Sequence, residues 1–275
     1  MIYDLGRQRG AVRPSPLFLA VLAVTAVGAA LAWLVTEPGS RLGDFGVFVL
    51  VLGGWITSVC IHEFAHAYAA YRAGDLSVEA RGYLTLNPFK YSHPFLSIIL
   101  PLVAIVGGGF ALPGGAVYLH PHAFRSKASR SMAAAAGPIT NIVFAVGLIV
   151  LARSQLSNLD VVQYLGGGDN HARFWGGVAF LGLLQVTAAV LNLLPVPGLD
   201  GYAIIEPYLS RETQQAMEQV KPWGLLGVIV LLFYARPIKD AFFAVVNTVY
   251  RAFGGTDLMN AFGYELFRWW TKNPL

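Results

Sequence analysis

Positions 61–66 read Ile-His-Glu-Phe-Ala-His, inside an apolar segment that runs from Phe45 to Tyr71. Residues four apart share one face of a helix, so the imidazoles of His62 and His66 are expected to close on a single metal ion. Two neutral imidazoles, a carboxylate from elsewhere in the chain and one open position for water suit zinc best. The stretch therefore predicts a zinc site with one ion per chain.

The residue after the first histidine is Glu63, a candidate general base for a water molecule bound to the metal. Water bound to zinc has a pKa near about 7 rather than about 15.7, and a carboxylate beside the first ligand can take its proton. Two histidines on one helical face can also be ordinary polar residues of a bundle. Ionisable residues inside a membrane segment cost roughly 2.5 kcal/mol or more each, so three together favour the functional site of a metallohydrolase.

The composition is that of a polytopic membrane protein. Of the 275 residues, 56% are hydrophobic and only 12% are charged, and the mean hydropathy is +0.57. The net charge of +4 comes from basic residues between apolar runs, where they mark topology rather than a nucleic-acid surface. The single cysteine, Cys60, excludes an intramolecular disulfide. We expect one membrane-embedded domain over 1–275, with its core at about 45–205 and a C-terminal helical pair and tail at 222–275.

The apolar runs predict an all-α fold with about six transmembrane helices. The runs lie at 17–35, 45–72, 132–152, 174–194, 222–235 and 238–253, and the last two are short for a span. Arginines ahead of the first run place the N-terminus in the cytosol, with a cleaved signal peptide as the alternative. The tail carries Trp269 and Trp270 and resembles an interfacial anchor. We therefore expect a multi-pass protein of the plasma membrane with both termini in the cytosol.

A proline and a glycine triplet interrupt the apolar run at 94–112. Basic residues flank this run on both sides, so we expect a re-entrant hairpin or partial span, with a plain extra span as the alternative. A short β-like edge segment follows at Gly114, Gly115, Ala116 and Val117. An exposed edge strand can pair with an extended peptide, although an ordinary connector is the alternative.

Two polar residues lie within or just after later apolar runs. The run at 174–194 is followed by two prolines and then Asp200. Prolines unwind a helix, so Asp200 is expected near the cytosolic face at the depth of His62 and His66, where it is a candidate third ligand. Asn141 lies three residues after a proline in an earlier run, and hydrogen bonding between helices is the ordinary role of such a residue.

Three motifs together resemble those of the site-2 protease family of intramembrane zinc metalloproteases. They are His62-Glu63-Phe64-Ala65-His66, Gly137-Pro138-Ile139-Thr140-Asn141, and Asn192-Leu193-Leu194-Pro195 leading to Leu199-Asp200-Gly201. The resemblance covers roughly residues 45–205 and points to a compact prokaryotic branch without a PDZ or CBS domain. It implies zinc ligands His62, His66 and Asp200, the general base Glu63, and Asn192 with Asn141 at the scissile carbonyl.

This resemblance implies hydrolysis of a peptide bond in or near the transmembrane helix of a membrane-anchored protein substrate. Glu63 would deprotonate the zinc-activated water and later protonate the leaving amine. The lipid bilayer is the other expected partner, nucleic acid is not expected, and the sequence does not indicate an oligomeric state. An intramembrane metal or proton-coupled transporter is the alternative, because transporters also carry intramembrane His and Asp. A CAAX-type membrane protease would take its third ligand from a downstream glutamate such as Glu206.

Overall fold

The computed structural model describes residues 12–91, 120, 123–167 and 171–271, and every regular element in these ranges is a helix. In chain order they are α1 (Pro16–Leu34), α2 (Arg41–Ala73), α3 (Ser77–Ala80), η1 (Tyr83–Thr85), η2 (Pro88–Lys90), α5 (Lys127–Gln155), α6 (Asn158–Leu165), α7 (Ala172–Asn192), α8 (Asp200–Ile205), η5 (Glu206–Tyr208), α9 (Arg211–Glu218), α10 (Lys221–Tyr234), α11 (Arg236–Ala252), α12 (Asp257–Phe267) and η6 (Trp269–Thr271). The expected all-helical fold is thus confirmed for these residues. The segments predicted as a re-entrant hairpin, 94–112, and as an edge strand, 114–117, lie outside them.

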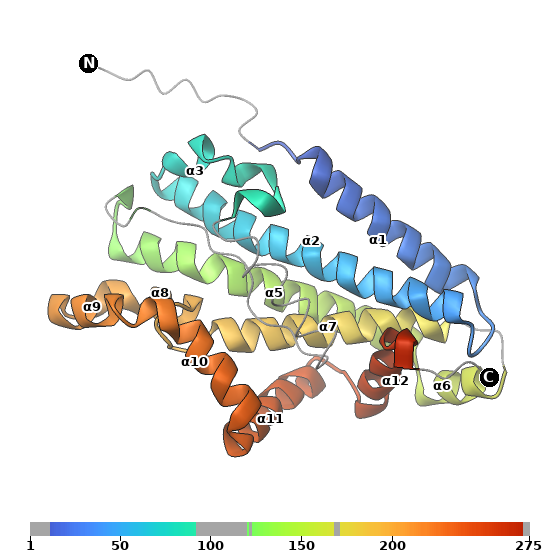
Figure 1. Ribbon diagram of the computed structural model, residues 1–275. Coiled ribbons are helices and arrows are strands. Elements are labelled where there is room, and N and C mark those ends of the chain that lie inside the picture. Colours follow the sequence, from blue (N-terminus) through green and yellow to red (C-terminus); the bar gives the residue numbers. More distant parts are fainter. Residues whose placement is uncertain (1–11, 92–119, 121–122, 168–170, 272–275) are drawn as a thin grey trace.

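Four helices, α1, α2, α5 and α7, are long and apolar enough to cross a membrane. They coincide with the first four predicted spans and run side by side along the long axis of the molecule (Figure 1). A fifth span results if α9 and α10, which meet at 66°, are counted as one broken crossing. The described residues therefore supply four or five candidate spans rather than about six, because α10 and α11 are each too short.

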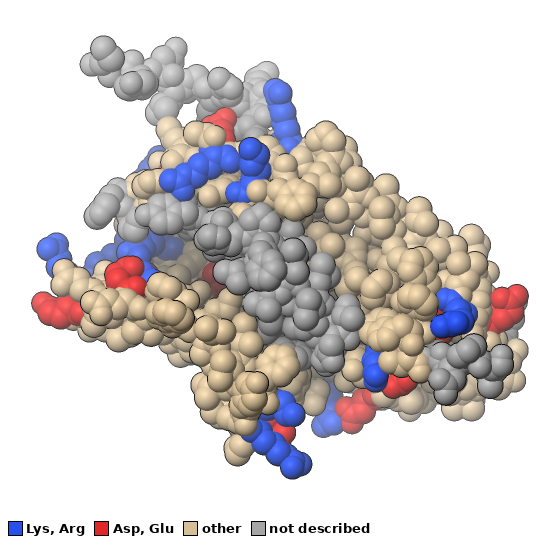
Figure 2. Space-filling model, viewed as in Figure 1, with Lys and Arg blue, Asp and Glu red and all other residues tan. Residues whose placement is uncertain are grey.

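The helix α7 lies at the centre of the bundle. It packs against α5, α2 and α12, and 83% of its most apolar window is buried inside the protein. The helix α1 lies at the edge, where it packs mainly against α2 and carries no charged residue. Figure 2 shows a broad surface over α1 that is almost free of charge and basic side chains gathered near α3. This distribution is typical of a lipid-facing surface bounded by a cytosolic end.

Small residues let α1 and α2 approach closely. A Cβ added at Gly28 would lie 2.6 Å from the backbone nitrogen of Leu50, and one added at Gly46 would lie 2.7 Å from the nitrogen of Ala32. Lipid tails are as apolar as leucine, so helices in a membrane associate through such close packing rather than through the hydrophobic effect. The glycines of the first two spans therefore serve helix contact.

The last helices carry the chain from one end of the bundle to the other. A Cβ at Gly198, in the loop after α7, would lie 2.5 Å from the carbonyl oxygen of Lys221, so α10 begins at the end where α3 lies. A Cβ at Gly263 in α12 would lie 2.2 Å from the carbonyl oxygen of Gly176, near the start of α7. The ring of Trp269 also contacts that of Phe45, 5.4 Å away, at the start of α2.

The described part of the tail packs at the end of the bundle away from the start of α1. We expected it on the same side as the N-terminus, but residues 257–271 pack at the opposite end of the bundle, beside α6 and the turn between α1 and α2 (Figure 1). The reason is apolar packing, because Phe262 and Phe267 are buried against α7. Such burial outweighs the weak topological signal of the few basic residues in the tail.

A buried ion pair holds the end of the bundle at which α6 lies. The Nε atom of Arg173, in α7, donates to Oδ1 of Asp44, in α2, over 3.2 Å, and both side chains are fully buried. The guanidinium also donates to the backbone carbonyls of Val35 and Glu37, between α1 and α2. A side chain at Gly43 would collide with this guanidinium. One arginine thus joins α1, α2 and α7.

We expect Arg173→Met to lower the thermal unfolding midpoint strongly, because it leaves the Asp44 carboxylate in the interior without the guanidinium. Breaking a buried ion pair costs about 3–5 kcal/mol, whereas replacing both partners is often close to neutral. The double variant Asp44→Leu with Arg173→Met should therefore be more stable than Arg173→Met alone. Thermal unfolding in detergent micelles, followed by tryptophan fluorescence, measures both. An Arg173→Met protein as stable as the wild type would contradict a structural role for the pair.

Candidate metal centre

The two histidines of the opening motif lie one turn apart on α2, in its second half. His62 and His66 are each 5% exposed, and Glu63 between them is 2% exposed. The ring centroids of His62 and His66 are 4.7 Å apart, and the Nε2 atoms of the two rings are 3.0 Å apart. The i, i+4 spacing has thus brought both rings to one point in the interior of the bundle.

Asp200 reaches the same point from the other side of the bundle. The helix α7 ends at Asn192, and Gly198 takes a positive φ of 98° that lets the chain turn back. Asp200 is then the first residue of α8, whose start packs so closely on the end of α7 that a Cβ at Gly201 would lie 2.2 Å from the Leu193 carbonyl. The two prolines between these helices therefore produce the predicted break.

The carboxylate of Asp200 faces both imidazoles. Its Oδ2 atom lies 3.3 Å from Nε2 of His62, and its Oδ1 atom lies 3.4 Å from Nε2 of His66. A metal that binds nitrogen and oxygen at about 2.0–2.1 Å in a tetrahedron separates its ligand atoms by roughly 3.3 Å. The two nitrogens and the carboxylate are thus close enough together to bind one tetrahedral ion. The residues fit zinc, with a fourth position left for water or substrate.

The helix α5 closes the site from a third side, where it has no side chain at the point of closest approach. A Cβ at Gly137 would lie 2.2 Å from Nε2 of His66 and 2.6 Å from Nε2 of His62. Four residues earlier, the carbonyl of Ala133 accepts a hydrogen bond of 2.7 Å from Nδ1 of His66. The glycine therefore keeps open the space that an ion between the two rings needs.

Two asparagines were predicted near the site. The Oδ1 atom of Asn141, in α5, lies 2.5 Å from Nδ1 of His62, and its Nδ2 atom donates to Gln185 in α7. Asn192 is 6% exposed at the end of α7, and its amide forms no hydrogen bond with other described side chains. The structure thus brings Asn141 to the back of a histidine. Residues 114–117, predicted to dock the substrate, lie outside the described ranges.

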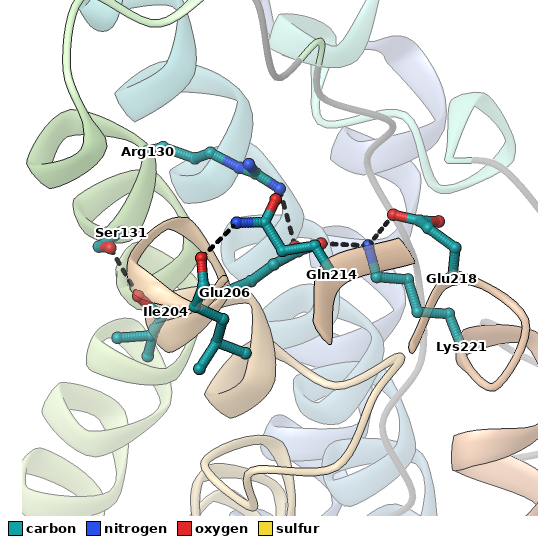
Figure 3. A network of polar contacts seen from close by, with 8 residues as sticks. Arg130, Ser131, Ile204, Glu206, Gln214, Glu218 and Lys221 are labelled. Atoms are coloured by element: carbon teal, nitrogen blue, oxygen red, sulfur yellow. Dashed lines mark hydrogen bonds and ion pairs between the residues drawn. The ribbon is translucent and has the colours of Figure 1, made fainter. Parts of the chain in front are cut away.

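Glu206, the candidate ligand of a CAAX-type site, is paired with two cations and is not part of the cluster formed by the two histidines and Asp200. Its carboxylate accepts from Arg130 over 2.7 Å and from Lys221 over 2.6 Å (Figure 3). Lys221 also pairs with Glu218, and Ser131 donates to the carbonyl of Ile204 over 2.6 Å. This polar network anchors the segment just after Asp200 to the start of α5 and to α10.

A second buried carboxylate fixes the chain just beyond α2. Asp75 is 1% exposed and accepts hydrogen bonds from the hydroxyl of Ser77 over 2.6 Å and from the backbone N–H of His120 over 2.9 Å. Burial disfavours the charged form of Asp75, but these hydrogen bonds hold its pKa below the ordinary value. The hydrogen bond from its backbone N–H ties His120 to the chain just beyond the end of α2.

The prediction from sequence missed the polar partners of the site. Gln185 and Ser58 are 1% and 5% exposed in the interior, and neither was predicted to have a role. A glutamine inside the run at 174–194 is a detectable signal, because an intramembrane amide needs a hydrogen-bonding partner. Which partner it finds depends on the rotation of three helices about their axes, which sequence spacing on one helix does not give.

Comparison with known proteins supports these observations. The family model described as peptidase family M50 matches residues 47–171. The chain is 48% identical to "Putative zinc metalloprotease Rip2" of Mycolicibacterium smegmatis and 47% identical to the protein of that name from Mycobacterium tuberculosis H37Rv, in each case over 96% of this chain and 96–97% of the relative. It is 31% identical to "Putative zinc metalloprotease YwhC" of Bacillus subtilis over 64% of this chain and 76% of that protein.

No solved structure matches the chain. The alignments to the Rip2 proteins run over nearly the whole length of both partners. Together with the zinc-compatible cluster of two histidines and an aspartate, they establish the class of the enzyme and its metal. The chain belongs to peptidase family M50, the site-2 protease family of zinc metalloproteases.

Proposed function

We propose that this zinc metalloprotease cuts a membrane-anchored protein substrate within or beside its transmembrane helix. The observation that carries the proposal is the position of the metal cluster, whose two histidines are buried where α2, α5 and α8 meet inside a bundle of membrane-spanning length. A substrate that reaches it must enter the bundle from the membrane or from the nearby end. A substrate helix must unwind there, because the hydrogen bonds of a helix shield its peptide bonds.

We assign one zinc ion to His62, His66 and Asp200. The support is their spacing of 3.0–3.4 Å and the absence of a side chain at Gly137. A zinc ion held there would polarise the scissile carbonyl and lower the pKa of a water molecule. The imidazoles bind as neutral ligands, and the Asp200 carboxylate supplies the negative charge of the set. Glu206 has no part in it, because two cations hold it elsewhere.

Glu63 is assigned as the general base. It is adjacent to a ligand on the same helix and is 2% exposed, so its carboxylate lies in a medium that strengthens electrostatic effects. It takes the proton from the attacking water and later gives it to the leaving amine. Figure 2 shows a hollow in the surface beside α8 with an acidic side chain inside it, which supports access of water from that end.

The remaining assignments concern the substrate. We propose that the buried amide of Asn192 donates to the scissile carbonyl, since the described residues leave it without a partner. Residues 114–117 are proposed to pair with the unwound substrate strand, an assignment that rests on the family resemblance. Both ends of the Asn141 amide are engaged by protein side chains, so we assign it a role behind His62 instead of at the carbonyl.

We further propose that residues 1–275 form one domain, multi-pass in the plasma membrane, with the N-terminus in the cytosol. The metal centre then lies near the cytosolic face. The basic side chains around the start of α5 and the end of α2 support this orientation. Since residues 257–271 pack at the other end of the bundle, we assign them to the outer side.

Zinc content tests the ligand set. We expect about one zinc per purified wild-type chain and a strong loss in His62→Ala, His66→Ala and Asp200→Ala, because each removes one of three protein ligands. Glu206→Gln is the matched control: it removes a buried carboxylate of the same segment and should keep its zinc. Metal analysis after gel filtration gives both numbers. If Glu206→Gln loses its zinc while Asp200→Ala keeps it, the third ligand is Glu206 and not Asp200.

Proteolysis by Glu63→Gln tests the base. Glutamine keeps the volume and can hydrogen-bond to water, but it cannot accept a proton at neutral pH. We expect a folded protein with normal zinc that cleaves a single-span substrate at least about 100-fold more slowly than the wild type. A metal transporter would keep most of its flux in this variant. Cleavage at the wild-type rate would refute the proposed mechanism.

Cysteine labelling tests the orientation. In a Cys60→Ala background, single cysteines at Ser126, Ser154 and Thr271, all exposed, report on the start of α5, the end of α5 and the tail. A maleimide that cannot cross membranes should label Ser154→Cys and Thr271→Cys from outside intact cells, and Ser126→Cys only after lysis. Thr271→Cys that behaves like Ser126→Cys would show that the tail is cytosolic after all.

A further inference from the structure

A continuous line of buried polar groups leads from the metal centre into the middle of the bundle. It starts at Nδ1 of His62, passes through the side chains of Asn141, Gln185 and Ser58, and ends at the backbone carbonyl of Trp55. The successive distances are 2.5, 2.8, 2.9 and 2.7 Å. The three intermediate side chains are at most 5% exposed and come from α5, α7 and α2. We call these three residues the polar relay.

The last member of the line sets the direction of every hydrogen bond in it. A carbonyl can only accept, so the Ser58 hydroxyl must use its one proton on Trp55. The Ser58 oxygen can then only accept from Gln185, which turns the amide nitrogen of Gln185 toward it. The amide oxygen of Gln185 is left facing Asn141 and accepts from its nitrogen.

The same logic continues to the metal ligand. With its nitrogen given to Gln185, Asn141 presents only its oxygen to His62. An oxygen there requires the proton of His62 to be on Nδ1, and this leaves the lone pair of Nε2 facing Asp200. His66 reaches the same state in one step, because Nδ1 donates directly to the carbonyl of Ala133. Both histidines are thus held in the tautomer that a metal needs.

The two histidines differ in how securely they are held. A backbone carbonyl cannot turn round, but the side-chain amide of an asparagine can rotate and present its nitrogen instead. That rotated amide would favour the opposite tautomer of His62, with the proton on Nε2 where the metal binds. In an interior without water, only the partners of Asn141 decide between the two orientations. Those partners are Gln185 and, behind it, Ser58.

We propose that Gln185 and Ser58 are positioning residues for the zinc site, which act through Asn141 to fix the tautomer and the ring orientation of His62. The inference rests on the zinc site proposed above. It gives a function to a glutamine and a serine whose side chains hydrogen-bond to Asn141, to each other and to the Trp55 carbonyl. Loss of such outer partners typically lowers metal affinity by 10–100-fold.

Zinc affinity of the full chain in detergent, measured by competition with a chelator, tests the proposal. We expect Gln185→Leu and Ser58→Ala to bind Zn²⁺ about tenfold more weakly than the wild type. The matched control is Thr187→Val, which removes a buried hydroxyl from the same helix as Gln185. The hydroxyl of Thr187 donates to the Leu183 carbonyl of its own helix, so this variant should keep the wild-type affinity.

A rescue variant separates tautomer control from general damage to the bundle. A carboxylate accepts through both oxygens and has no wrong orientation, so Asn141→Asp does not need the relay to direct it. Adding Asn141→Asp to Gln185→Leu should therefore restore zinc affinity to within a few-fold of the wild type. The ¹⁵N chemical shift of His62 in metal-free protein should report protonated Nδ1 in the wild type and in the rescued variant, and a mixture of tautomers in Gln185→Leu.

The outcomes distinguish this inference from the proposed function. If His62→Ala binds zinc as the wild type does, the zinc site itself is wrong. If His62 is required but Gln185→Leu and Ser58→Ala keep the wild-type affinity, the site stands and the positioning role is refuted. The third outcome concerns the rescue variant, Asn141→Asp with Gln185→Leu. If it binds zinc as weakly as Gln185→Leu alone, the positioning role is also refuted, provided that both proteins are monodisperse and unfold like the Thr187→Val control.

Discussion

Three electron-rich groups, the imidazoles of His62 and His66 and the carboxylate of Asp200, lie with their nearest atoms 3.0–3.4 Å apart. Lone pairs at this separation repel each other unless a positive charge lies among them, and the burial of both histidines weakens the screening by water. Most of the surrounding structure serves to hold these groups together in spite of this. Hydrogen bonds behind both rings, a glycine in α5 and the tight turn before α8 all act to that end.

The bundle is secured at both ends of its central helix. Where α7 begins, Arg173 and Asp44 form an ion pair to which solvent has no access. Beyond its other end, Glu206 joins the segment after Asp200 to α5 and α10 through two cations. Between these two anchors the polar relay links α2, α5 and α7, and the other contacts include close packing of small residues. The position of Asp200 relative to α2 therefore depends on the ion pairs at the two ends of the bundle and on the packing of the helices between them.

Much of the candidate site could be predicted from the sequence, because its residues lie in short motifs whose spacing determines their local structure. The i, i+4 histidines share a helix face, and the prolines before Asp200 break a span at a depth that follows from topology. The four long spans follow from apolar runs alone. The partners of Gln185 could not be predicted, because they depend on how three helices are rotated. The packing of Phe262 and Phe267 on α7, at the other end of the bundle from the start of α1, could not be predicted from the basic residues of the tail.

The ligands come from parts of the chain that are made at different times. His66 and Asp200 are 134 residues apart, and α5, α6 and α7 lie between them. A ribosome that adds about 5–20 residues per second needs roughly 7–27 s to cover that distance. During this interval the two histidines are present without the carboxylate proposed to complete their zinc site. On that assignment the nascent chain lacks a complete metal site until Asp200 has been made, and a zinc ion bound afterwards would tie α2 to α8.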